Sequence, residues 1–140
     1  MNRQAAEWRK RKVEQILELL KGGTVIVEGR HDIRVLSMLG IRAIPYERIV
    51  NMKEAPDPNE TVYIMVDSDK GGDQKSEKIM DALLTIDKRY TINSDVSQKL
   101  LKMLNLTSVE QLTRPIEEIR ENEKGRYYGK NLSRDSKVHG

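Results

Sequence analysis

The sequence predicts an α/β protein built on a compact parallel sheet with helices on both faces. Two short apolar runs, residues 24–28 and 61–66, are rich in β-branched side chains and too short for independent helices. Segments with the apolar period of an amphipathic helix flank these runs. Strands alternate with helices along the chain, which is the pattern of a parallel-sheet fold.

Composition sets the broad class. A chain of 140 residues is long enough for one hydrophobic core and too short for two domains. No cysteine is present, which excludes disulfides and thiolate zinc sites and fits a reducing compartment. No apolar stretch approaches the roughly 20 residues of a membrane span, and no apolar signal region follows the first residues. We therefore expect a cytoplasmic protein that does not bind a membrane.

The first predicted helix begins at the N-cap candidate Asn2 and ends near Lys21, before Gly22 and Gly23. Trp8 is expected to extend its apolar stripe and to pack rather than to stack on a base. The other residues of the stripe recur with the helical period and are expected to lie on the sheet: Val13, Ile16, Leu17 and Leu20.

Strands and short helices follow. We expect a strand over residues 24–28, a helix over 32–39 that Gly40 ends, and a strand over 42–44. A brief extended piece is expected over residues 45–51.

The second half of the predicted sheet begins after a proline-rich loop at residues 56–59. A strand is expected over 61–66, a helix over about 73–88 and a short strand over 90–92.

The C-terminal part reads as helices and a tail. Ser94 or Asp95 caps one helix, residues 107–110 resemble a capping box, and another short helix starts at Arg114. From Lys124 onward apolar periodicity is lost, so we expect an irregular basic tail. The predicted organisation is a basic N-terminal helix (1–21), a core (22–92), C-terminal helices of the same domain (93–123) and the tail (124–140).

Carboxylates follow two of the predicted strands directly. Glu28 ends the first, and Asp67 and Asp69 end the strand at 61–66. Buried carboxylates are costly unless they meet a cation or solvent, and in a parallel sheet the carboxyl ends of strands meet where ligands bind. Magnesium prefers carboxylate oxygens and leaves room for phosphate, and Gly72 would let the backbone approach a phosphate closely. The pattern therefore predicts a magnesium site for phosphate chemistry.

Each carboxylate also has a structural explanation. Asp69 or Asp73 could cap the following helix, and Glu28 could pair with Arg30 or Arg34 across a turn. The combination of the two acidic strand ends is more specific than either part.

Two other phosphate-handling sites fit less well. His31 and Asp32 resemble the metal-binding dipeptide of phosphohydrolases, but the only other histidine is His139, and Asp32 could equally be an N-cap. Asp67 and Asp69 also resemble the haloacid dehalogenase motif, which usually lies on the first strand of its domain, whereas here the motif comes late.

Residues 25–32 (VIVEGRHD) and 65–72 (MVDSDKGG) resemble the two signatures of the Toprim domain. That domain occurs in bacterial-type primases, topoisomerases, some repair proteins, overcoming-lysogenization-defect nucleases and ribosomal RNA maturases. The resemblance covers residues 22–90, and the chain is most similar to the small stand-alone Toprim proteins, close to the ribosomal RNA maturases.

The resemblance implies a Toprim-like (Rossmann-like) sheet and Mg²⁺ held by an acidic triad, with two ions in all and Mn²⁺ as a substitute. Glu28 would be a metal ligand or general acid/base, Asp67 a bridging ligand, and Asp69 would complete the second site. Asp32 stands where many members carry an acidic residue, and Gly72 matches the glycine that opens the following helix.

The expected function is that of a Mg²⁺-dependent nuclease (a hydrolase) that acts on structured RNA or DNA, for example in RNA processing. The alternative is a non-catalytic nucleic-acid or ribonucleoprotein binding module that retains the metal site. The basic first helix and tail are expected to hold the nucleic-acid backbone. Tyr127 and Tyr128 could stack on a base or anchor the tail. The residues expected to contact phosphate are Arg30, Lys70, Gly72, Arg126 and Lys130.

Overall fold

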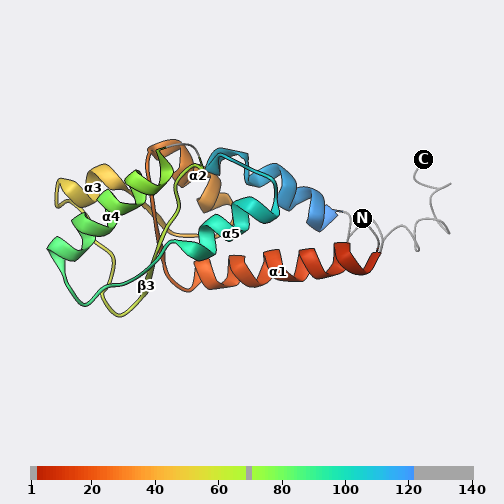
Figure 1. The fold of residues 1–140 in the computed structure, drawn as a ribbon, viewed down its shortest axis with the longest axis horizontal. Helices are drawn as coiled ribbons and strands as arrows, with labels where there is room; N and C mark the ends of the chain where they lie inside the picture. The colour runs from red at the N-terminus through yellow and green to blue at the C-terminus, as the bar shows by residue number, and fades with distance from the viewer. Residues whose placement is uncertain (1–2, 69–70, 122–140) are drawn as a thin grey trace.

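A computed structural model describes residues 3–68 and 71–121 of the chain. Within these residues four strands form one parallel sheet in the order β2-β1-β3-β4 (Figure 1). The strands are β1 (Thr24–Val27), β2 (Ala43–Pro45), β3 (Thr61–Ile64) and β4 (Thr91–Asn93). The α/β class and the parallel sheet predicted from the sequence are confirmed.

The register places the carboxyl ends of the two central strands side by side. Ile26 of β1 lies opposite Ile64 of β3, and beyond that pair the Met65 amide donates to the Ile26 carbonyl at 2.9 Å. Because both strands run in the same direction, the residues that follow them leave the sheet at one edge. Glu28 and Asp67 lie at that edge.

Helices cover both faces of the sheet, as expected. The helices are α1 (Arg3–Lys21), α2 (Arg30–Met38), α3 (Tyr46–Val50), α4 (Gly72–Ile86) and α5 (Asp95–Met103), followed by a 3-10 turn (Val109–Gln111) and by helical residues 113–121. Figure 1 shows α3 and α4 on one side of the sheet and α1 and α5 on the other. None of these described helices is both long and apolar enough to cross a membrane.

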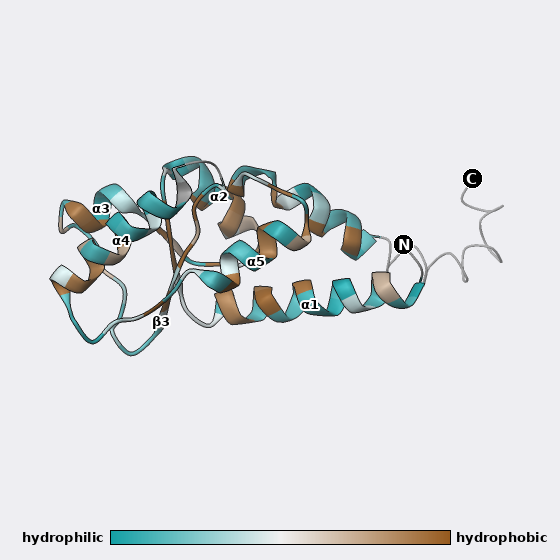
Figure 2. Cartoon of the chain, in the orientation of Figure 1, coloured by the Kyte–Doolittle hydropathy of each residue, from teal (hydrophilic) through white to brown (hydrophobic). Residues whose placement is uncertain are grey.

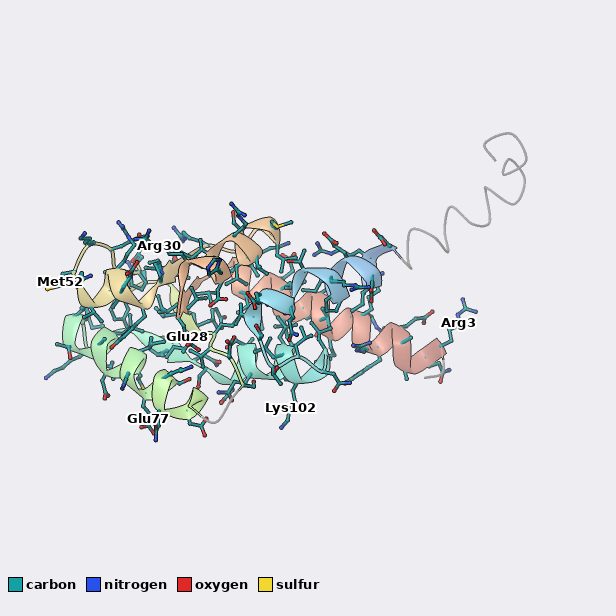
Figure 3. The ribbon with its side chains drawn as sticks, turned by 90° about the horizontal axis from the view of Figure 1, so that it is seen from above. Arg3, Glu28, Arg30, Met52, Glu77 and Lys102 are labelled. Carbon is teal, nitrogen blue, oxygen red and sulfur yellow. The ribbon has the colours of Figure 1, made fainter. Side chains whose placement is uncertain are left out.

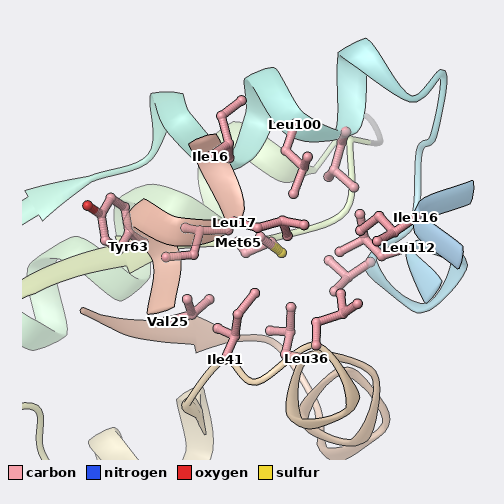
Figure 4. Close-up of a cluster of buried hydrophobic side chains, with 14 of the residues drawn as sticks. Ile16, Leu17, Val25, Leu36, Ile41, Tyr63, Met65, Leu100, Leu112 and Ile116 are labelled. Atoms are coloured by element: carbon pink, nitrogen blue, oxygen red, sulfur yellow. The ribbon is translucent and has the colours of Figure 1, made fainter. Parts of the chain in front are cut away.

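The sheet separates two hydrophobic clusters because strand side chains alternate between faces. Val25 and Met65 belong to the larger cluster, whereas Ile26 and Ile64 belong to the smaller one. Figure 2 shows how apolar residues gather on the strands and on the inward sides of the helices. In Figure 4 the larger cluster converges from the sheet and four other parts of the chain, through residues that include Leu17, Leu36, Leu100, Leu112 and Ile116.

The prediction for Trp8 was wrong. Its side chain is 52% exposed, and its ring faces the Lys12 ammonium group, 6.0 Å from the ring centroid. At about 100° per residue, Trp8 lies well off the line of the buried stripe. Arg9 lies close to that line, and its Nε donates to the Met103 carbonyl at 3.1 Å. The buried part of the stripe runs from Val13 to Leu20, as predicted.

The extended piece expected over residues 45–51 is instead the helix α3. Pro45 is extended (φ −75°, ψ 146°) and serves as the N-cap, where its missing amide hydrogen costs nothing. Glu47 in the first turn and Arg48 in the last complement the helix dipole. Ile49 is buried against the sheet, and this contact stabilises the short helix.

Several helix starts differ from the predicted ones. The N-cap of α2 is Gly29 and that of α4 is Gly71, so Asp32 and Asp73 lie in first turns rather than at caps. Ser94 is the N-cap of α5, but its side chain makes no capping bond; the Val96 amide donates instead to Asn93 Oδ1 at 3.0 Å. The expectations for Asn2 and for the tail from Lys124 onward lie outside the described residues.

Candidate functional site

Glu28 and Asp67 meet at the carboxyl edge of the sheet. The backbone amide of Asp67 donates to Glu28 Oε1 at 3.1 Å, although the two residues are 39 positions apart. The contact follows from the β1–β3 register, because Glu28 is the first residue after β1 and Asp67 is the third after β3. The two residues that the sequence predicted to meet at this edge therefore lie side by side, joined through the Asp67 backbone amide.

A lysine shares Glu28 with that amide. Lys75 of α4 places its Nζ 3.0 Å from Glu28 Oε2, and the two side chains are partly buried, with 40% and 28% exposed. The alternative explanation of Glu28 was an ion pair with Arg30 or Arg34, but its described ion pair is with Lys75. Arg30 bonds to Glu47 at 3.0 Å instead, because α2 begins at Arg30 and turns its side chain toward α3.

Asp67 is fixed by the segment that follows α5. Its Oδ1 accepts a hydrogen bond from the Val109 amide at 2.9 Å, and the next amide, of Ser68, donates to the Thr107 carbonyl at 2.8 Å. The capping box predicted for residues 107–110 is wrong, because the N-cap of the 3-10 turn is Ser108 rather than Thr107 and its side chain makes no capping bond. The segment instead uses its backbone to hold the end of β3.

A third carboxylate, that of Asp32, interacts electrostatically with Glu28 and Asp67. Burial raises the pKa of Asp32 above its ordinary value, and the negative charges of Asp67, Glu28 and Glu110 add to the rise, while a hydrogen bond from the Gly29 backbone opposes it. Negative charge is therefore concentrated at the edge where β1 and β3 end. A cation placed among these oxygens would be stabilised.

A groove of about 600 Å³ opens beside Asp67. Ser68 and Asp73 line it from the β3–α4 side. Its other wall comes from α5 and the segment after it, through Asp95, Gln98, Lys99, Lys102 and Leu106. Acidic and basic groups thus share one open groove at the carboxyl edge.

The described residues contain no group of three His, Cys, Asp or Glu side chains placed to hold a metal ion. Asp69, the third member of the predicted triad, lies outside those residues, so the triad stays a prediction. The donor set nevertheless fits a hard cation, since it offers carboxylate oxygens at a sheet edge. The described hydrogen bond of Asp67 uses only Oδ1, and the Lys75 ammonium group already provides positive charge beside Glu28.

Only two of the five residues predicted to contact phosphate lie among the described residues. Gly72 is the first residue of α4, as expected for the glycine that opens this helix. Arg30 lies at the start of α2 and bonds to Glu47. Lys70, Arg126 and Lys130 lie outside the described residues, as do the two tail tyrosines.

Sequence reasoning missed Lys75 and the contribution of the segment at 107–109. A signal for Lys75 was present, since it stands one turn into the helix that follows the acidic strand. The backbone contacts of residues 107–109 left no such signal, because an amide donor is the same at every residue except proline.

No family model and no curated protein matches the chain. A solved structure of a protein from Aquifex aeolicus is similar in fold, with a TM-score of 0.55 at 20% sequence identity. The likeness covers 73% of this chain and 95% of the other. At this identity the likeness extends to the fold alone.

Proposed function

We propose that this chain is a small Toprim-type nuclease that cleaves phosphodiester bonds of structured RNA or DNA in the cytoplasm with Mg²⁺. The observation that carries the proposal is the meeting of Glu28 and Asp67 at the carboxyl ends of adjacent parallel strands. Ligand sites of open parallel sheets lie at this edge. The sequence signatures around both residues support the same chemistry.

In this proposal Glu28, Asp67 and Asp69 would hold the metal, which would supply positive charge to the phosphate and make the attacking water more acidic. Glu28 accepts or returns the proton of the attacking water. Lys75 lies against Glu28 and adds a positive charge where a phosphate oxygen would gain negative charge. The 107–109 segment keeps Asp67 in place during the reaction.

One observation favours the alternative of a nucleic-acid or ribonucleoprotein binding module. Both carboxylate oxygens of Glu28 already have partners within the chain, the Asp67 amide and Lys75. A site neutralised by its own lysine can persist without a metal. Under this alternative the edge binds nucleic acid without turnover.

The test is cleavage of end-labelled structured RNA, duplex DNA and single-stranded DNA, each with Mg²⁺, Mn²⁺ or EDTA. We expect metal-dependent cleavage by the wild-type protein and none by Asp67→Asn. Asn keeps the oxygen that accepts the Val109 amide, so this variant should fold. It should also bind nucleic acid within a few-fold of the wild-type affinity.

Asp81→Asn is the matched control, because Asp81 is exposed on α4 and lines a groove between α3 and α4. This variant should cleave like the wild type. Cleavage that survives Asp67→Asn would overturn the catalytic assignment. Binding without cleavage by the wild type would establish the alternative.

A further inference from the structure

We propose that a nucleic-acid strand crosses the carboxyl edge of the sheet from an arginine groove at α2 to the lysines of α5, with its phosphates bound at both ends of this path. The inference rests on the proposed function and states the path that the nucleic-acid substrate takes across the protein surface. The arginine groove is defined by Arg30, Ile33, Arg34, Ser37, Met38, Pro45 and Arg48.

The arginine groove has a volume of about 630 Å³. Arg30, Arg34 and Ser37 follow one another at spacings of four and three residues, so they share one side of α2. Arg48 reaches the groove from α3. Three guanidinium groups and a hydroxyl therefore line one open groove.

Guanidinium groups bind phosphate through paired N–H donors, which suits a phosphodiester better than a lysine would. Arg30 bonds to Glu47 and Arg48 bonds to Glu54, but both ion pairs are exposed and weak, so a phosphate can replace the carboxylate. Arg34 is exposed, and none of the described ion pairs includes it.

The lining also indicates which part of a nucleic acid binds. Ile33, Met38 and Pro45 are the apolar residues of the groove, and no aromatic ring is among its lining residues. Bases of single strands are usually held by stacking on aromatic rings. The groove thus suits the sugar–phosphate backbone rather than a base.

The path leads over the carboxylates. Arg30 is two residues after Glu28, and Lys102 lines the groove that contains Asp67. In Figure 3, which views the molecule from above, Glu28 lies between Arg30 and Lys102. Lys99 is a second lysine on that side, beside Asp73 and Asp95. A strand bound at both ends would therefore present a phosphodiester to Glu28 and Asp67.

The experiment measures binding of end-labelled single-stranded RNA and single-stranded DNA in EDTA, between about 50 and 200 mM salt. Asp67→Asn protein serves as the background, so cleavage cannot interfere. Arg34→Glu and Lys102→Glu are compared with Lys88→Glu. Lys88 is exposed before β4, at the opposite edge of the sheet, and its reversal changes net charge equally.

We expect Arg34→Glu and Lys102→Glu each to weaken binding about tenfold and to reduce the salt slope by about 0.7, the value for one phosphate on a single strand. Lys88→Glu should stay within twofold of the background protein. Arg34→Gln should give a smaller loss in the same direction, which separates lost contact from added repulsion.

Equal binding by Arg34→Glu, Lys102→Glu and Lys88→Glu, or no binding by the background protein, would overturn the path. Its failure is distinguishable from failure of the proposed function. If the wild type never cleaves but Arg34 and Lys102 control binding, the path stands and the nuclease assignment falls. If cleavage occurs and these variants bind normally, the reverse holds.

Discussion

Lys75 is the residue of the acidic site whose contact the sequence did not predict. Its ammonium group lies 3.0 Å from Glu28 Oε2, an oxygen that we expected to bind a metal ion. A lysine so placed compensates negative charge in the protein without metal. It would also have to share Glu28 with any metal that binds.

Replacing Lys75 with Ala should therefore make stability depend on metal. We expect a lower Tm than the wild type in EDTA, because Glu28 loses its charge partner, and a larger rise on adding Mg²⁺, because the metal then replaces the ammonium group. Thermal unfolding followed by circular dichroism measures both. Lys78→Ala, an exposed lysine on the same helix, is the control and should behave like the wild type. An equal Mg²⁺ response in all three proteins would contradict this account of Lys75.

Gly23 lies where the chain passes closest to β3. A Cβ there would come within 2.3 Å of the Thr61 carbonyl oxygen and 2.8 Å of the Tyr63 ring. We expect Gly23→Ala to reduce the free energy of unfolding by about 1–3 kcal/mol, as overpacking does. Gly22→Ala is the matched control, because its Cβ would come no closer than 3.5 Å to the Leu19 carbonyl oxygen. Equal stabilities in urea unfolding would show that the contact is relieved by small shifts.

At the residue scale, the sequence predicted Glu28 and Asp67 because carboxylates at strand ends leave a visible pattern. It could not predict their partners. Whether Glu28 meets Arg30 or Lys75 depends on how α2 and α4 leave the edge, which the spacing along the chain does not determine. Arg30 pairs with Glu47 because α3 exists, and α3 itself was not predicted.

Among the elements, α1 and the helical residues 113–121 are tied by an ion pair between distant parts of the chain. Glu14 accepts hydrogen bonds from Arg120 at 3.0 and 3.3 Å. The hydrogen bond from Arg120 lowers the pKa of Glu14 below its ordinary value; burial opposes this effect and the charge of Arg120 adds to it. The pair thus joins the first described helix to the last.

The lowered pKa gives a pH dependence with a definite sign. Glu14 stabilises the folded chain at pH values above its ordinary pKa of 4.5, and this contribution is lost as the pH falls through the lower folded value. Glu14→Gln should therefore cost about 0.3–1 kcal/mol at neutral pH and nothing at the acid end. Urea unfolding at several pH values measures the difference. Glu118→Gln, in an exposed pair, is the control and should show a smaller change. A cost that persists below the folded pKa would show that charge is not its cause.

Element positions were predicted well where the sequence carries a clear local pattern. The helical period marks the buried stripe of α1, and short β-branched runs mark the two central strands. The segment 45–51 was missed because five residues hold barely one helical turn, too few to show a period. Its helix depends on the burial of Ile49, which is a tertiary contact.

In the molecule as a whole, residues after α5 contribute to the larger hydrophobic cluster. Leu112 and Ile116 are fully buried there, beside Leu17 of α1 and Val25 of β1. Val109, in the same part of the chain, also supplies the amide that donates to Asp67 Oδ1. We therefore expect the sheet and the site to form in one cooperative transition.

Leu112→Ala should accordingly destabilise the whole chain by about 2–5 kcal/mol, the usual range for a fully buried leucine. A single urea transition shifted to lower concentration is the expected result. Leu84→Ala, at a leucine that is 36% exposed, should cost less than Leu112→Ala. Two separate transitions in the Leu112 variant would show that the C-terminal helices fold independently of the sheet.

The metal is the premise on which the proposed nuclease depends most. Its binding is measured directly by titrating the protein with Mn²⁺ and following free Mn²⁺ by electron paramagnetic resonance. We expect saturable binding by the wild type, a loss of at least tenfold in affinity for Asp67→Asn, and wild-type binding by Asp81→Asn. Failure of the wild type to bind Mn²⁺, or equal binding by Asp67→Asn, would contradict the account and leave the edge as a binding surface neutralised by Lys75.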